Sequence, residues 1–344
     1  MWKYVLKRIV LAIFTTFIIL SLTFILMKLL PFQRPIGTEN AQYSYFNHQV
    51  QLGFLMDSPL ELQGKVLLWK YTDPTGLKHY YYQIPIMKQY FSWLKNILID
   101  WDWGTSVYIM PNVDAMKIIS SRLPTSMYLN IISVVISVPL GIILGIVAAL
   151  KKNSATDNVI STLVMVFISI PSFVLITFLI LILCYKLHWL PPQWPSPSAP
   201  TSQKVLGYII PVAALSFGSI CGYCRFTRAE LCEVMSSEYL LLARTKGLTK
   251  KQAIIRHALR NAMVPIVPAI LAEFISILGG SMILENLYGI PGIGSLFVEA
   301  LNSKDYNVLF VDMALFTTIS LVAGVFLDIS YGFIDPRIRM GAKK

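Results

Sequence analysis

The chain has 344 residues, of which 55% are hydrophobic and only 14% are charged. Because soluble domains carry about 25% charged residues, this composition argues against a soluble globular protein and indicates a protein of the lipid bilayer. A net charge of +11 would suggest a nucleic-acid partner for a soluble protein, but in a membrane protein its meaning depends on where the charges fall.

Runs of about 20 apolar residues match the thickness of the hydrocarbon core, and the sequence contains six such runs. The first follows Lys3, Lys7 and Arg8, as in a signal peptide, but its apolar stretch is too long and no small-x-small cleavage site lies before Pro31. We therefore expect an uncleaved signal anchor and an all-α polytopic membrane protein with six transmembrane helices. The expected spans are Ile9–Leu30, Thr125–Leu150, Val159–Tyr185, Gly207–Cys224, Met263–Leu284 and Tyr306–Ile334.

The basic residues predict the orientation. If both termini are cytoplasmic, the short inner segments hold more than half of the 29 Lys and Arg residues. The positive-inside rule then favours cytoplasmic termini in a plasma or inner membrane, and it explains much of the net charge without nucleic acid. The expected parts are 1–30 with the first span, an extracellular region 31–124, a core 125–334 with five spans, and a cytoplasmic tail 335–344.

The extracellular region 31–124 is expected to form a small α/β insertion. Two stretches rich in Val, Leu, Trp and Tyr, Lys65–Thr72 and Leu77–Ile84, flank Asp73-Pro74-Thr75-Gly76, which is a type I turn sequence. This pattern predicts a β-hairpin. Apolar residues then recur at helical spacing over 90–98 and are followed by two tryptophans, which predicts a helix lying in the membrane interface. The region is either a dock for an extracellular partner or a lid that only caps the bundle.

The inner segment 225–262 is predicted to form a helical elbow. Glu238–Gly247 reads as a short amphipathic helix ending in a glycine that can adopt the left-handed conformation. Thr249 and Gln252 fit a capping box, and a second helix follows into the fifth span. Because both ends are anchored in the bilayer, such an elbow can transmit a push from a cytoplasmic partner. A DNA-binding helix–turn–helix is disfavoured by the same anchoring.

The run Glu238–Pro265 resembles the EAA loop of binding-protein-dependent ABC importer permeases, more narrowly the B-type subunit of the oligopeptide and dipeptide permease family. The similarity continues in order along nearly the whole chain except residues 38–85. The motifs that carry it are Tyr4-Val5-Leu6-Lys7-Arg8, Trp93…Gly104-Thr105-Ser106, Arg122-Leu123-Pro124-Thr125, Ile170-Pro171-Ser172-Phe173, Tyr288-Gly289-Ile290-Pro291-Gly292-Ile293-Gly294 and Asp335-Pro336-Arg337-Ile338-Arg339.

This resemblance implies a type I ABC importer permease fold without enzymatic activity, in which the EAA-loop helix inserts into a groove on an ATPase subunit. The family's second alanine is absent, since Tyr239 and Leu240 follow Glu238. The partners implied are a second homologous permease, two cytoplasmic ATPases and an extracellular or periplasmic peptide-binding protein. The residues expected to couple to the ATPase are Glu238, Tyr239, Ala243, Arg244, Gly247 and Leu248.

No phosphate-binding loop of the G-x-x-x-x-G-K-S/T type occurs in the sequence. We therefore expect this chain to bind no cofactor, with ATP and Mg²⁺ held by partner ATPase subunits. The four histidines lack metal-ligand spacing. Cys221 and Cys224 have redox C-x-x-C spacing but sit at the end of a predicted span, which favours packing.

Ionisable residues at membrane depth are candidates for the translocation pathway. Glu273 departs from the uncharged polar residue usual in the family, and it either faces the pathway, where it could hold a peptide's amino terminus, or pairs with a neighbouring helix. Asp312 and Asp328 lie nearer the ends of the last span, which favours interfacial or structural roles. The pathway candidates are Glu273, Ser276, Glu285 and Asn286.

Gly141-x-x-x-Gly145 permits close helix packing within the bundle or against the partner permease, or a homodimer seam.

The expected function is to form half of a peptide import pathway. Alternatives are a permease for nickel, haem or sugar on the same scaffold, and an ion-coupled secondary transporter, for which no internal repeat is visible. An intramembrane enzyme lacks any convincing catalytic set.

Overall fold

The computed structural model describes residues 2–32, 34–35, 37–276 and 280–334. The chain divides into two compact units. The insertion unit comprises residues 11–122 and 296–318, and the core unit comprises residues 1–10, 123–295 and 319–344. The closing motif at 335–339 and the expected tail 335–344 lie outside the described residues.

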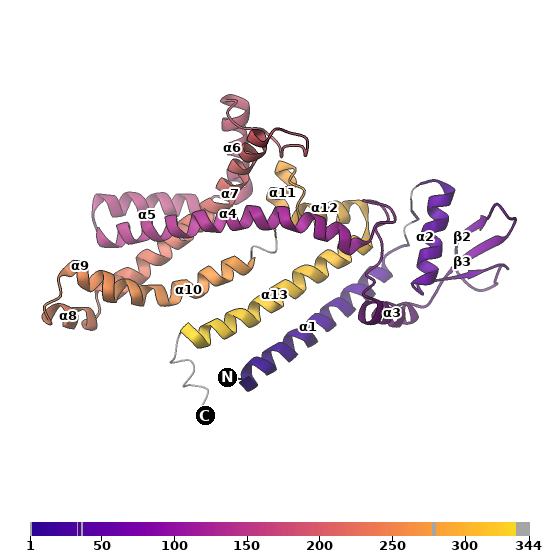
Figure 1. Cartoon of the computed structure of the whole chain (residues 1–344), viewed down its shortest axis with the longest axis horizontal. Coiled ribbons are helices and arrows are strands. Elements are labelled where there is room, and N and C mark those ends of the chain that lie inside the picture. Colours follow the sequence, from indigo (N-terminus) through magenta and orange to yellow (C-terminus); the bar gives the residue numbers. More distant parts are fainter. Residues whose placement is uncertain (1, 33, 36, 277–279, 335–344) are drawn as a thin grey trace. The chain divides into compact units, whose positions relative to one another are not determined.

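The insertion unit combines the first helix with a small α/β region (Figure 1). Strands β2 and β3 form the predicted hairpin, with Trp69 opposite Tyr81. At its turn, the Asp73 carboxylate accepts hydrogen bonds from the backbone N–H groups of Thr75 and Leu77, each at 2.9 Å. The elements of this unit are α1 (Trp2–Leu29), α2 (Glu39–Gln51), β1 (Leu55–Ser58), β2 (Leu67–Thr72), β3 (Lys78–Gln83), α3 (Ile86–Lys95), the π-helix η1 (Asn96–Asp100) and parts of α4, α12 and α13.

Two elements of this unit were not predicted. Strand β1 pairs with the free edge of β3, so the sheet has the order β1-β3-β2. Helix α2 packs on the sheet, where Phe46 is fully buried and its ring centroid lies 4.7 Å from that of Trp69. These contacts give the insertion its own aromatic core, which explains how so short a sheet remains ordered.

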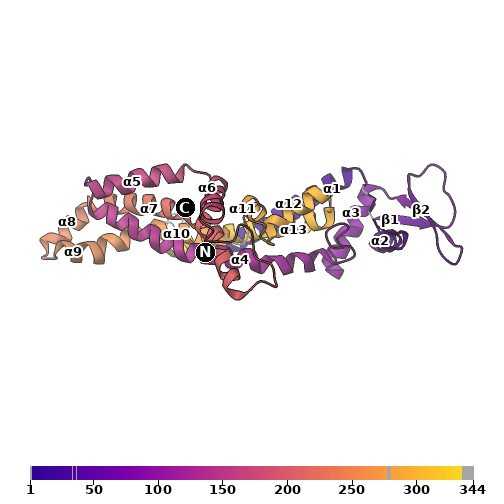
Figure 2. The same ribbon diagram turned by 90° about the horizontal axis from the view of Figure 1, so that it is seen from above.

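The core unit is a helical bundle (Figures 1 and 2). Helices α4 and α7 approach most closely at glycines, since a Cβ built on Gly141 would lie 2.6 Å from Tyr223 Cβ and one on Gly145 would lie 2.6 Å from Thr227 Cβ. The Gly-x-x-x-Gly motif therefore packs within the bundle. The elements are α4 (Ala115–Leu150), α5 (Ala155–Ile168), α6 (Ser172–Leu179), η2 (Ile180–Lys186), α7 (Thr201–Met235), α8 (Glu238–Thr245), α9 (Lys250–Ala253), η3 (Ile254–Ala258), α10 (Leu259–Ser276), α11 (Met282–Tyr288), α12 (Ile293–Ser303) and α13 (Tyr306–Ile334).

Among the described residues, five helices are long and apolar enough to cross a membrane, or six spans if one bent helix pair is counted as one. The chain is thus a mostly helical multi-pass membrane protein with a small sheet, as expected. Two span boundaries were drawn too narrowly. Helix α4 starts at Ala115, inside the expected extracellular region, and α7 extends over 35 residues around the expected fourth span.

The expected third span, Val159–Tyr185, is broken into two helices. Helix α5 ends at Ile168, α6 begins after Pro171, and the two helices meet at 98°. Proline lacks an N–H group and disfavours helical geometry in the preceding residue, so it ends α5 within the apolar run.

The prediction of a fifth span over Met263–Leu284 is wrong at its C-terminal end. Helix α10 begins at Leu259 and ends at Ser276, and the following apolar residues form the separate helix α11. Between them, Gly280 has a φ of 61°, a left-handed conformation that interrupts helices. The neighbouring Gly279 lies outside the described residues.

Candidate functional site

Helix α8 forms the first arm of the predicted elbow and turns one residue inward and several outward. Leu240 is 5% exposed and packs in an apolar cluster with Leu231, Ala253 and Ala258 from the neighbouring helices. Its opposite side is apolar but open, because Tyr239, Leu241 and Leu242 are 41%, 63% and 56% exposed. Helix α8 is therefore held to the core by one leucine and offers an apolar face to the outside.

The corner of the elbow has both predicted features. Gly247 adopts a φ of 94°, which closes α8 in the left-handed conformation that favours glycine. The Thr249 N–H donates to Gln252 Oε1 at 3.1 Å, and the Gln252 N–H donates to Thr249 Oγ1 at 3.3 Å. This reciprocal capping box confirms the prediction and fixes the start of the second arm.

The second arm of the elbow is continuous with the helix that follows it. Helix α9, the π-helix η3 and α10 follow one another without a break from Lys250 to Ser276. Pro265 and Pro268 lie inside α10 without ending it. The corner is thus joined to a candidate membrane helix with no flexible linker between them.

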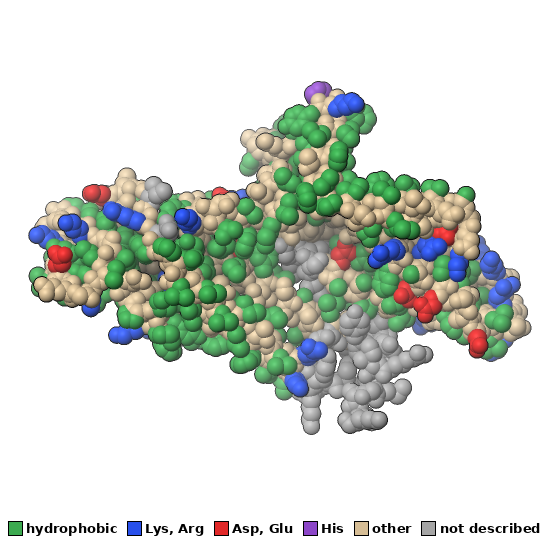
Figure 3. Space-filling view, turned by 180° about the vertical axis from the view of Figure 1, so that it is seen from behind, with side chains coloured by type: hydrophobic (Ala, Val, Ile, Leu, Met, Phe, Trp, Pro, Cys, Tyr) green, Lys and Arg blue, Asp and Glu red, His purple; other side chains and the backbone are tan. Residues whose placement is uncertain are grey.

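Positive charge gathers at this end of the core unit (Figure 3). Arg244 lies in the last turn of α8 and Glu238 in its first, an arrangement that complements the helix dipole. Lys246, Lys250 and Lys251 are also exposed. The elbow thus combines an open apolar face with a basic surround.

The structure divides the expected coupling residues into two groups. The first group is exposed and consists of Glu238, Tyr239, Arg244 and Gly247. Ala243 and Leu248 are half-buried, and Leu248 packs against the cluster around Leu240. The exposed pair Leu241 and Leu242 was not predicted. The signal was available, because three successive leucines on an eight-residue helix cannot all face the core.

The pathway candidate Glu285 is buried at 2% exposure and fully engaged in the core unit. Its carboxylate accepts hydrogen bonds from Ser126 Oγ at 2.7 Å, the Ser281 N–H at 3.3 Å and the Ser295 N–H at 3.0 Å. Gly292 lies so close to this carboxylate that a Cβ there would collide with it. Glu285 thus ties the turn between α11 and α12 to α4.

The other pathway candidates differ in accessibility. Glu273 on α10 is half-buried and is a hydrogen-bond partner of the Tyr223 side chain on α7, which favours the helix-pairing alternative. Asn286 is exposed on α11. Ser276 ends α10, but its side chain lies outside the described part, as does that of Asp328. Asp312 is fully buried in the insertion unit.

Two further buried carboxylates were missed. Asp157, 1% exposed on α5, forms a bidentate ion pair with Arg228 on α7 at 2.6 and 2.8 Å. In the insertion unit, Asp305 Oδ2 accepts hydrogen bonds from Ser106 Oγ at 2.6 Å and from the N–H groups of residues 107–109. In both cases the partner is distant in sequence, so no local pattern marks the pair.

Comparison with known proteins places these features in a family. The model of the family described as "Binding-protein-dependent transport system inner membrane component" matches residues 141–340. The chain belongs to this family. It is a transport permease, not an enzyme.

The permease is similar along its whole length to named relatives. It is 31% identical to the dipeptide transport system permease protein DppB of Bacillus subtilis, covering 100% of both chains. It is 32% identical over 339 residues to the oligopeptide transport system permease protein OppB of Escherichia coli K12, covering 98% of this chain and 100% of the relative.

Solved structures share the fold. An inward-facing chain of the MetNI methionine ABC transporter matches with a TM-score of 0.51 and 16% identity, covering 64% of the permease and 97% of that chain. A second crystal form gives a TM-score of 0.52 at 15% identity, with the same coverage.

Within the permease, Cys221 and Cys224 are 4% and 1% exposed and pack in an apolar cluster with Val164.

Proposed function

We propose that this permease forms one half of the membrane pathway of an ATP-driven peptide importer. The observation that carries the proposal is full-length similarity, at 31–32% identity, to permeases named for dipeptide and oligopeptide transport. Cargo peptides would be delivered by an extracellular or periplasmic binding protein. Both termini and the elbow would lie in the cytoplasm, as the distribution of basic residues favours.

The proposed assembly contains a second homologous permease and two cytoplasmic ATPases that bind ATP and Mg²⁺. The absence of a phosphate-binding loop in this sequence supports a division of labour between separate chains. Half of a pathway is also consistent with the number of candidate spans, because a wide route for peptides needs more helices than one chain supplies.

Coupling is proposed to run through α8. Its open face, formed by Tyr239, Leu241 and Leu242, would seat in a groove of the ATPase, while Leu240 keeps the helix attached to the core. Closure of the ATPases would then move the corner, and the unbroken second arm would carry the movement into the membrane. An apolar anchor surrounded by basic residues is a common composition for a docking site.

A reconstituted transporter tests this proposal. We expect Leu241→Glu to lower ATP-dependent peptide uptake by at least about tenfold and to weaken co-purification of the ATPases, because a charge cannot enter an apolar groove without loss of about 2 kcal/mol or more. Leu60→Glu is the matched control, since Leu60 is 72% exposed in the insertion unit and no coupling role is proposed for it.

Thermal stability of both variants should equal that of the parent, which separates coupling from folding. The coupling proposal fails if Leu241→Glu retains uptake. Uptake by the purified chain alone under an ion gradient would support a secondary transporter instead. Competition with dipeptides, longer peptides, nickel, haem and sugars, in the presence of the cognate binding protein, tests the cargo separately.

A further inference from the structure

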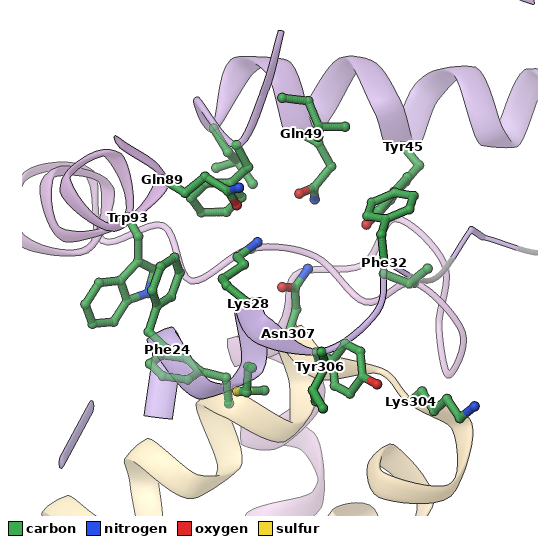
Figure 4. A pocket seen from close by; sticks show the side chains of 18 of the residues that line it. Phe24, Lys28, Phe32, Tyr45, Gln49, Gln89, Trp93, Lys304, Tyr306 and Asn307 are labelled. Atoms are coloured by element: carbon green, nitrogen blue, oxygen red, sulfur yellow. The ribbon is translucent and has the colours of Figure 1, made fainter. Parts of the chain in front are cut away.

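A cavity of about 110 Å³ lies inside the insertion unit (Figure 4). Its walls come from the end of α1, from α2 and α3, and from the first turns of α13. Trp93 and Phe24, which are 7% and 5% exposed, form part of an aromatic lining. The proposed transport function assigns no role to this cavity.

The Lys28 side chain extends into the centre of the cavity (Figure 4). Its ammonium nitrogen lies 4.1 Å from the ring centroid of Phe54 and 5.5 Å from that of Phe24. Within the described residues, Lys28 has no ion pair with a carboxylate. Asp102 lines the same cavity, but its Oδ1 accepts a hydrogen bond from the Gly104 N–H at 2.9 Å.

Ring faces attract an ammonium only weakly, and a cation withdrawn from water is stabilised far more by an anionic acceptor. Lys28 therefore lies against an apolar wall, and no carboxylate of the described residues, Asp102 included, is in ion-pair contact with it.

A second donor points to the same place. Gln49 on α2 is 4% exposed, and its Nε2 has no hydrogen-bond partner in the part of the chain that the structure describes. Figure 4 shows its amide directed toward Lys28 from the opposite wall. Gln89 faces the cavity too, but its Nε2 donates to the Ile84 carbonyl at 2.7 Å. Lys28 and Gln49 thus present two converging donors to one acceptor group.

We infer that this cavity binds the carboxylate of a small aromatic or aliphatic acid. The two carboxylate oxygens match the two donors, Lys28 and Gln49, and the aromatic walls accept the apolar remainder of the acid. At about 110 Å³ the cavity is smaller than the roughly 150 Å³ that encloses benzene, so the ring of an aromatic acid would be only partly enclosed, and a peptide would not fit. The site is therefore separate from the proposed peptide pathway.

Benzoate and benzamide form a matched pair of probes, because they share shape and differ in the carboxylate. Binding to the purified full-length permease can be followed by saturation-transfer NMR. We expect benzoate to bind at least about tenfold more tightly than benzamide, since a hydrogen bond to a charged group discriminates by about this factor. Lys28→Met should abolish the preference while keeping the apolar volume.

Lys88→Met is the matched control, because Lys88 is exposed on α3 and does not line the cavity. It should leave the preference unchanged, and Gln49→Leu should weaken benzoate binding, because one of the two donors to the carboxylate is lost. Unchanged thermal stability of the variants would show that the cavity is intact.

Several results would overturn the inference. Equal binding of benzoate and benzamide would show that the cavity does not recognise the carboxylate charge. Absence of benzoate binding would indicate that water alone solvates Lys28. Inorganic phosphate binding as tightly as benzoate would reject the carboxylate preference. Displacement of benzoate by the cognate binding protein would identify an acidic side chain of that protein as the occupant, instead of a small molecule.

Discussion

The Glu285 carboxylate accepts hydrogen bonds from Ser126, Ser281 and Ser295, and at 2% exposure it has almost no water to replace them. A carboxylate is stable in such a place only when donors surround it. Here the donors come from α4, from the residue before α11 and from the first turn of α12, which follows the turn that includes Gly292. The position of that turn therefore depends on one side chain.

Replacing this carboxylate should destabilise the permease. We expect Glu285→Ala to lower the free energy of unfolding by about 3 kcal/mol or more, because three buried donors would lose their acceptor. Thermal denaturation in detergent measures the change. Glu299→Ala is the control, since Glu299 is 49% exposed and pairs with Arg122 only at 3.7 Å, a contact worth about 1 kcal/mol at most. Loss of uptake at unchanged stability would contradict the structural role and favour the pathway role.

The hairpin turn should respond to acid. The Thr75 hydroxyl, with two backbone N–H groups, lowers the pKa of the half-buried Asp73 carboxyl. Because the folded-state pKa lies below the unfolded value of about 3.9, the carboxylate stabilises the turn above that value, and this contribution is lost as the pH falls through the folded-state pKa.

Hydrogen exchange over residues 67–83, compared between pH 5 and pH 3, should show the turn opening in the parent chain. Asp73→Asn removes the titrating group, so the same comparison should show no additional opening in that variant. Equal acid sensitivity in both proteins would exclude Asp73 as the cause.

Local sequence patterns predicted contacts between neighbouring residues well, but they could not predict contacts between residues that are distant in the sequence. The capping box at Thr249, the glycine at the end of α8 and the turn at Asp73 all depend on contacts within five residues, so the sequence contains the whole interaction. Ser126 and Glu285 are 159 positions apart, and nothing in the sequence alone connects them. Glu285 was therefore taken for a pathway residue.

At the scale of elements, hydropathy identified apolar runs but not their interruptions. The first and last spans agree closely with α1 and α13 because those runs are continuous, and the second ends with α4 at Leu150 although α4 starts earlier, at Ala115. The third is broken at Pro171 and the fifth ends before Gly280, where composition stays apolar while the backbone leaves helical geometry. Proline alone is an ambiguous signal, since Pro139 lies inside α4 without ending it.

Helix α3 supports the predicted position in the membrane interface. The Tyr90 hydroxyl lies 2.9 Å from Ser21 Oγ on α1, eight positions before Leu29 and so about 12 Å along the helix from the end of an apolar span. On its other side, Phe91 and Leu98 are 62% and 72% exposed. A helix that contacts a span at this depth and exposes such residues should meet lipid.

A spin label at position 91, in reconstituted bilayers, tests this placement. We expect collisions with oxygen to exceed those with a water-soluble nickel complex, because oxygen concentrates in the hydrocarbon. A label at position 75, on the exposed hairpin turn, should show the reverse order. Strong nickel collisions at position 91 would place α3 in water, and protection from both reagents would indicate a protein contact.

At the scale of the whole molecule, the orientation is the most consequential prediction. We expect a cysteine introduced at Glu61 to react with a membrane-impermeant maleimide in intact cells, and one at Lys250 to react only after permeabilisation. Both side chains are exposed, so accessibility reports the side of the membrane. The parent chain serves as the blank, because its four cysteines are buried or half-buried. Labelling at position 250 in intact cells would reverse the orientation and remove α8 from reach of any cytoplasmic ATPase.

The ordered motifs led to the correct family where composition could only indicate a membrane protein. Composition and residue spacing predicted the location in the bilayer, the hairpin and the elbow. The transport function and the partners were expected only from the resemblance. The region 38–85, where the resemblance stops, is also where α2 and β1 went unpredicted.

The right-angled break between α5 and α6 has a consequence for how cells make this protein. Ser169, Pro171 and Ser172 are exposed there, and the backbone at such a break needs hydrogen-bond partners wherever lipid surrounds it. A neighbouring subunit or a water-filled passage would supply them. We therefore expect a copy of this permease made without its partner subunits to be less stable in the bilayer than one within the assembly.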